Sequence, residues 1–175
     1  MSIIKALGFP TRDLVVFKSL LVIFVVLLIS GCAMPASGPL YSQELSDAPT
    51  DKSRVFIYRP SKFFQGGTYP YIHVNGEKFF ALRNGGFNYV DLPIGTHKIS
   101  MEPGLSWTLG LSGLELQITK PETIYLKFVW SEDAGLGSVV PIGSYTTVTI
   151  QGAAHLVPVS VVEAKNDLFR MKLSD

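Results

Sequence analysis

The chain contains a single cysteine, Cys32, whose thiol is the first side chain to consider for chemistry. One cysteine cannot form a disulfide within its own chain. An unpaired thiol is a hazard in an oxidising compartment, so either the protein is cytosolic or Cys32 is chemically occupied. Cys32 ends the stretch LLVIFVVLLISGC, residues 20–32. The fate of this thiol therefore depends on the apolar segment before it.

The first thirty residues have the layout of an export signal. Lys5, Arg12 and Lys18 precede about ten residues of pure Leu, Val, Ile and Phe, and small residues follow. A spanning helix needs roughly twenty apolar residues. Residues 14–29 form a longer run, but it contains Lys18. A retained signal-anchor with one membrane span stays open as an alternative.

The residues Ile29-Ser30-Gly31-Cys32 resemble the lipobox of bacterial lipoproteins. This resemblance implies cleavage between Gly31 and Cys32, transfer of diacylglycerol to the thiol and acylation, typically with palmitate, of the freed amine. Two or three acyl chains would anchor the protein stably, since one chain alone binds only marginally. Ala33 follows the cysteine where an aspartate usually favours inner-membrane retention, so the resemblance implies the outer membrane, facing the periplasm.

Composition divides the chain into three parts. We predict a signal peptide over residues 1–31, a lipidated flexible tether over 32–52 and one folded domain over 53–175. The tether is rich in Pro and Ser. Beyond residue 31 the chain holds 12 basic and 13 acidic residues, so charge gives no argument for nucleic acid as a partner.

The domain reads as a series of short strands with turn residues between them. Asn75-Gly76 is a strong hairpin signal, and Asn84-Gly85-Gly86 and Pro93-Ile94-Gly95 are expected to continue an antiparallel meander. Ser160 and Glu163 have capping-box spacing, which predicts a short helix over residues 161–168. We predict an all-β fold: an antiparallel β-sandwich of about seven to eight strands, Ig-like or transthyretin-like.

The strand motifs resemble a bacterial domain of unknown function, number 2846 in the domain catalogues. The motifs that carry this resemblance are Tyr58-Arg59-Pro60, Val74-Asn75-Gly76, Asn84-Gly85-Gly86-Phe87 and the turn from Asp91 to His97. These motifs are structural, so the resemblance implies a small lipid-anchored β-domain and carries over no activity.

Three histidines and a few acids are the remaining candidates for catalysis or metal binding. His97 is in phase with Ile99 and Met101 and is expected in the core, while His73 shares a face with Tyr69 and Tyr71. His155 completes the set, and no pair has ligand spacing, so we predict no metal, no cofactor and no enzyme. Residues 135–143 are glycine-rich without the Lys of a phosphate loop and are read as a mobile loop.

Arg59 and the loop after it carry the remaining expectations. Arg59 is given a structural role, with Asp91 suggested as its partner across the end of the sheet. Phe63 and Phe64 are adjacent in a loop with two glycines, so strand alternation does not bury both. Together with Tyr69 and Tyr71 they form a candidate partner-binding loop, unless they plug the end of the sandwich.

These features favour a lipid-anchored, non-enzymatic binding or structural module of the cell envelope. Membrane lipid would be its partner through acylated Cys32, with an envelope protein or glycan as a further partner. The alternatives are an envelope hydrolase, which needs converging acids or a His–acid pair, and the signal-anchored protein.

Overall fold

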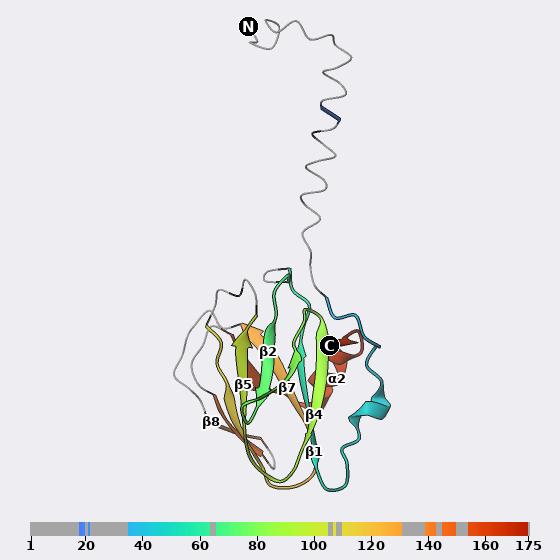
Figure 1. Ribbon diagram of the computed structural model, residues 1–175. Helices are drawn as coiled ribbons and strands as arrows, with labels where there is room; N and C mark the ends of the chain where they lie inside the picture. The colour runs from blue at the N-terminus through green and yellow to red at the C-terminus, as the bar shows by residue number, and fades with distance from the viewer. Residues whose placement is uncertain are drawn as a thin grey trace, which may run out of the picture. The chain divides into compact units, whose positions relative to one another are not determined.

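The computed structural model describes residues 18, 19, 21, 35–63, 66–104, 107, 110–130, 139–142, 145–149 and 154–174. The chain divides into two compact units, Met1–Cys32 and Ala33–Asp175. The described strands all belong to the second unit, which is drawn with its sheets in Figure 1. Cys32 and Gly31 lie outside the described residues.

One sheet of the second unit has six strands in the order β3-β2-β5-β6-β9-β8. Their bounds are β2 Pro70–Val74, β3 Glu77–Ala81, β5 Gly95–Pro103, β6 Leu114–Ile118, β8 Val139–Ile142 and β9 Tyr145–Thr149. All neighbours in this sheet run antiparallel. Asn75 and Gly76 join β2 to β3 with φ values of 52° and 87°. The predicted hairpin is confirmed, because a type I′ turn needs positive φ at both central residues.

The other sheet has five strands in the order β10-β7-β1-β4-β11. Their bounds are β1 Ser53–Arg59, β4 Gly86–Leu92, β7 Thr123–Trp130, β10 Ala154–Pro158 and β11 Lys172–Leu173. β1 runs parallel to β7, and β11 runs parallel to β4. The sandwich is therefore confirmed, but it is not wholly antiparallel. Strands brought together from distant parts of the chain are free to align in either direction.

The expected antiparallel meander is wrong beyond its first hairpin. Residues 82–85 connect β3 of the six-stranded sheet to β4 of the five-stranded sheet, and the chain returns to the six-stranded sheet through residues 93–94. Both turns cross between the layers instead of closing hairpins. Turn residues indicate that the chain reverses direction, but they do not determine which sheet the next strand joins.

The described residues contain eleven strands, more than the sequence suggested. One addition lies in the segment read as a mobile loop: Val139–Ile142 forms β8 and pairs with β9. Its β-branched residues favour a strand. Another is the two-residue β11, which is too short to give a pattern.

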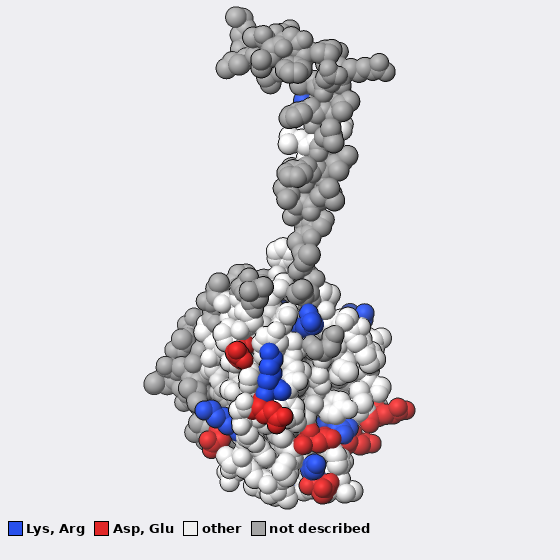
Figure 2. Space-filling view, viewed as in Figure 1, with Lys and Arg blue, Asp and Glu red and all other residues white. Residues whose placement is uncertain are grey.

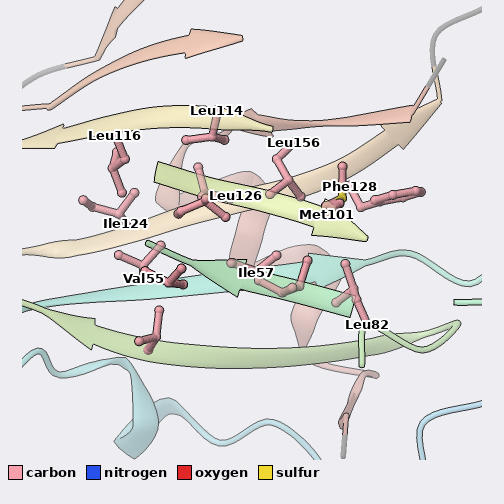
Figure 3. Packing of buried hydrophobic residues seen from close by; sticks show 14 of the residues in the cluster. Val55, Ile57, Leu82, Met101, Leu114, Leu116, Ile124, Leu126, Phe128 and Leu156 are labelled. Atoms are coloured by element: carbon pink, nitrogen blue, oxygen red, sulfur yellow. The ribbon is translucent and has the colours of Figure 1, made fainter. Parts of the chain in front are cut away.

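The main core lies between the two sheets. β1, β6 and β7 each send alternate apolar side chains into it, and Figure 3 shows them pointing toward one another from both layers. The buried set includes Val55, Ile57, Ile72, Leu82, Ile99, Leu114, Leu116, Ile124, Leu126, Phe128 and Leu156. In β7, Ile124, Leu126 and Phe128 face this core while Tyr125 faces the other way.

A second apolar cluster covers the outer face of the five-stranded sheet. Phe56, Tyr58, Phe87 and Tyr125 are all buried in it, beneath a helix and an N-terminal segment. Phe56 stacks on Tyr125 with ring centroids 5.3 Å apart. β1 is consequently buried on both of its faces, in keeping with its unbroken apolar run from Val55 to Tyr58.

Helix α2, Val161–Leu168, packs on this face near β7. Its start is as predicted: the Ser160 side chain accepts a hydrogen bond from the Glu163 N–H. The Glu163 carboxylate does not close a capping box but binds Lys127 Nζ at 2.9 Å. Lys127 also binds Asp167 at 2.8 Å. Burial lowers the pKa of Lys127, but its hydrogen bonds to Asp167 and Glu163 outweigh this and leave the pKa raised.

The segment before β1 is part of the folded unit. Residues 35–47, here called the strap, lie against β11, and Tyr41 packs edge-on to Phe56 and Phe87. The strap ends in the 3₁₀-helix η2, Gln43–Ser46, and the Leu45 carbonyl accepts a hydrogen bond from Arg54. This packing differs from the flexible tether that composition suggested. Isolated apolar residues hold the strap in place. The composition of the segment as a whole is rich in proline and serine, which is typical of a flexible chain, so it did not indicate this packing.

Candidate functional site

The loop after β1 places Phe63 in solvent. Its side chain has a relative exposure of 105%, the highest of the large apolar side chains that are described. The loop before it is held from both directions: Lys62 N–H donates to Asn84 Oδ1 at 2.9 Å, and Asn84 Nδ2 donates to the Lys62 carbonyl at 3.0 Å. Phe63 therefore follows directly on a residue, Lys62, that is held by two hydrogen bonds. Phe64, its expected companion, lies outside the described residues.

Tyr69 and Tyr71 form a separate pair at β2. Their rings meet edge to face with centroids 5.5 Å apart. A hydrogen bond with Tyr69 raises the pKa of the Tyr71 hydroxyl. Lys78 Nζ lies 3.2 Å from the Tyr71 ring centroid, and the Arg83 guanidinium carbon lies 4.7 Å from that of Tyr69. This pair with its two cations is called the tyrosine face below.

The four residues predicted as one loop thus divide into two groups. Phe63 projects from the β1–β2 loop, whereas the tyrosine face lies on the sheet. Residues 83 and 84 connect them, because Arg83 stacks on Tyr69 while Asn84 holds Lys62. Sequence reasoning missed this link, since it depends on a connection between β3 and β4 that lies some twenty residues along the chain.

His73 and Glu102 lie on the same side of the six-stranded sheet. Tyr71 and His73 alternate with buried Ile72 and Val74, which confirms that the tyrosine and the histidine share a face. His73 Nε2 lies 2.8 Å from Glu102 Oε2, and the Glu102 side chain is 58% exposed. An exposed pair of this kind is screened by water and contributes little free energy.

His97 has a structural role. His97 is buried as predicted, with Nε2 2.8 Å from the Pro93 carbonyl and Nδ1 3.2 Å from Asn75 Nδ2. It therefore braces the two turns at one end of the sandwich. His155, in β10, is partly buried.

The suggested pairing of Arg59 with Asp91 is wrong. Asp91 instead forms a two-pronged ion pair with Arg54, both contacts at 2.8 Å. The hydrogen bond with Asp91 raises the pKa of Arg54. Arg54 and Asp91 are direct partners across β1 and β4, whereas Arg59 is opposite Gly86. Register, which the sequence alone did not fix, decides which arginine meets the acid.

Arg59 instead points inward at the other end of the sandwich. It is in phase with Val55 and Ile57 and is 1% exposed. Three aromatic rings surround its guanidinium carbon, which lies 5.4 to 5.9 Å from the ring centroids of Trp107, Phe128 and Trp130. Nη1 donates to the Thr68 carbonyl at 2.7 Å. Burial lowers the pKa of Arg59 to about 10, so it stays charged at neutral pH.

Neither a metal site nor a spanning helix is found where the structure can be described. No group of three His, Cys, Asp or Glu residues within the described ranges is placed to hold a metal ion. Among the same residues, no helix has the length and apolar character needed to cross a bilayer. Figure 2 shows charges of both signs mixed over the visible face of the domain, in keeping with its near-neutral sequence.

The fold defines a β-sandwich domain covered on one side by a helix and a strap. Residues 49–138 match the family described as protein of unknown function (DUF2846), and the chain belongs to this family. The family resemblance drawn from the strand motifs is confirmed. No curated protein and no solved structure matches the chain.

Proposed function

We propose that this protein is an exported lipoprotein, anchored through acylated Cys32, whose β-sandwich is a non-enzymatic binding or structural module of the cell envelope. The observation that carries the proposal is the position of the strap. Pro35 bridges to Asn84 and Ala36 is buried, so the folded body begins three residues after the lipobox cysteine. Such an anchor is joined directly to a rigid domain, which suits a module held at a membrane surface.

The residues that sequence offered for chemistry support a non-enzymatic role. His97 braces turns, Arg59 fills an aromatic cage and Asp91 pairs with Arg54. Each of these polar groups is used to hold elements together.

We place partner binding on the tyrosine face. Two tyrosine hydroxyls and two cations lie beside an exposed carboxylate there, and aromatic side chains with polar ends are common in binding surfaces. The partner class is an envelope protein or glycan. The location is the outer membrane, facing the periplasm, which follows from Ala33 after the cysteine.

The anchor is tested by intact mass measurement of protein extracted from membranes. We expect a chain that starts at Cys32 with diacylglycerol and an amide-linked acyl group, and a Cys32→Ser variant that loses both. A mass that retains residues 1–31 would support the signal-anchor alternative, and a free thiol would overturn lipidation.

Partner binding is tested by cross-linking in cells followed by capture of the protein. We expect the double variant Tyr69→Ser, Tyr71→Ser to lose cross-linked partners that the wild-type chain captures. Ile94→Ser, which changes an exposed residue of the β4–β5 turn, is the matched control. Equal capture by both variants would remove the tyrosine face from the proposal.

The His73–Glu102 contact favours a second candidate, the envelope hydrolase, because a histidine beside a carboxylate can act as a general base. Its test is hydrolysis of fluorogenic ester and glycoside substrates by the purified protein. Activity that His73→Ala abolishes would establish this candidate.

A further inference from the structure

Hydrogen bonds on both sides of Phe63 hold this residue in an exposed position. The hydrogen bonds between Lys62 and Asn84 fix the chain on one side of it, and the Gly66 N–H donates to the Phe63 carbonyl at 3.1 Å on the other. Gly66 permits this closure, since a Cβ there would lie 2.8 Å from the Lys62 carbonyl oxygen and 3.0 Å from Asn84 Nδ2. The Phe63 ring is thus held wholly in water, and its burial against an apolar surface would be favourable.

The same asparagine receives the chain that comes from Cys32. The Ala36 N–H donates to the Asn84 carbonyl at 3.2 Å, and Pro35 forms a parallel bridge with Asn84. The backbone of Asn84 therefore holds the start of the strap, while its side chain holds the loop that presents Phe63. Both segments are fixed to one residue at one end of the sandwich.

Chain length sets how far this end can be from an anchor at Cys32. Three residue steps separate Cys32 from Pro35, and a fully extended chain covers at most about 11 Å in three steps. The polar headgroup region of one leaflet is roughly 5–7 Å thick. Even with this linker fully extended, a domain that begins at Pro35 stands at most about 4–6 Å beyond the headgroups of the membrane that holds Cys32.

We propose that Phe63 contacts the lipid surface in which the same chain is anchored, with its ring at the boundary between headgroups and acyl chains. Phe side chains on the apolar face of interfacial amphipathic helices are buried at this depth. Exposed Lys62 lies next to it in the chain, and its long side chain can reach lipid phosphates while its stem stays near the ring. The inference rests on the acylation of Cys32 proposed above, and it assigns Phe63 to lipid and the tyrosine face to other partners.

The experiment places a fluorescent reporter at position 63 of the full-length, lipidated protein in vesicles of phosphatidylethanolamine and phosphatidylglycerol. Cys32 is the only cysteine and its sulfur is blocked by the lipid, so Phe63→Cys carries one free thiol for an environment-sensitive dye. The control is Ile94→Cys, because Ile94 is also an exposed apolar residue but lies in the turn at the opposite end of the sandwich. Spin-labelled lipids quench a dye only when it enters the bilayer.

We expect strong quenching and a blue-shifted spectrum at position 63, and neither at position 94. The inference would be overturned if aqueous iodide quenches the dye at position 63 and spin-labelled lipid quenches it no more than the dye at position 94. This is also the result expected if Phe63 binds a protein instead of lipid. A second pair tests the ring itself: a dye on Ser61→Cys should lose most of its lipid quenching when Phe63→Ser is added. Quenching that Phe63→Ser leaves unchanged would contradict a role for the ring.

Intact mass of the same samples separates this inference from the proposed function. A chain without lipid on Cys32 overturns the lipoprotein proposal. A lipidated chain with an aqueous dye at position 63 overturns only the membrane contact of Phe63.

Discussion

The two sheets share one core but differ in what covers their outer faces. On the five-stranded sheet, α2 and the strap bury Phe56, Tyr58 and Phe87. On the six-stranded sheet, side chains such as those of Lys98, Glu115 and Gln117 are exposed. The strand sequences reflect this difference, since β1 has four consecutive apolar residues from Val55 to Tyr58 whereas β6 alternates apolar and polar residues. The covered side carries stability, and the open side holds the side chains that are available for partners.

The largest expected effect comes from the same substitution made on each side. Phe56→Ala removes a fully buried ring that meets those of Tyr41, Phe87, Tyr89 and Tyr125. A core Phe→Ala change costs about 3–5 kcal/mol of the free energy of unfolding. Phe79→Ala, at an exposed position of β3, should cost about 0.5 kcal/mol or less. Urea unfolding followed by circular dichroism measures both.

Similar losses for Phe56→Ala and Phe79→Ala would contradict the comparison. They would mean that α2 and the strap leave the outer face of the five-stranded sheet loosely covered.

The next effect tests whether the strap is part of the fold. Tyr41→Ala removes two edge-to-face ring contacts and the hydrogen bond between the Tyr41 and Ser46 hydroxyls. Each aromatic pair contributes about 0.5–1.5 kcal/mol, so we expect a loss of about 2 kcal/mol and faster proteolytic cleavage before Ser53. Wild-type and variant chains that are cut equally fast there would show that the strap adds nothing to the domain.

Local patterns predicted what depends on neighbouring residues. The Asn75-Gly76 hairpin and the Ser160 cap each follow from residues within a few positions of one another, and each is confirmed. The strap, the parallel pairing of β1 with β7 and the crossing of β4 between layers depend on distant contacts. A single sequence gives no local signal for such contacts, and they were missed or misread.

The candidate site shows the same division. Strand phase predicted that Tyr71 and His73 share a face, whereas loop composition left open whether Phe63 is exposed or plugs the end of the sandwich. The burial of Arg59 also had a signal, since it is in phase with Val55 and Ile57, but its charge suggested an acid partner instead of an aromatic cage. The role of Asn84 had no signal, because its contacts reach back to residues 35, 36 and 62.

A smaller effect, which depends on pH, distinguishes the two sides again. Tyr58 is buried, and its hydroxyl donates to Asp167 at 3.0 Å. Burial first, and then the charge and hydrogen bond of Asp167, raise the pKa of Tyr58 well above the usual value near 10. A raised pKa in the folded state gives a contribution to stability that is complete below about pH 10 and is lost as the pH rises further.

Tyr58→Phe should therefore cost about 1 kcal/mol at neutral pH, the usual net value of a hydrogen bond. Above about pH 10 its free energy of unfolding should fall less steeply than that of the wild type. Tyr71→Phe on the open face is the comparison: the pKa of Tyr71 is also raised, chiefly by its hydrogen bond with Tyr69 and not by burial, so its alkaline slope should change less than that of Tyr58→Phe. Denaturant unfolding at a series of alkaline pH values measures all three slopes. An unchanged slope in Tyr58→Phe would show that other groups control alkaline unfolding.

The smallest effect lies on the open side, at the His73–Glu102 pair. The two groups are 2.8 Å apart, but the glutamate is more than half exposed, so water competes with their attraction. Exposed pairs couple by about 0.2–1 kcal/mol, and we expect a value near the lower end. A double-mutant cycle with His73→Ala and Glu102→Ala measures the coupling energy directly. A coupling well above about 1 kcal/mol would indicate a preorganised pair, of the kind that a hydrolase needs and a screened surface contact does not supply.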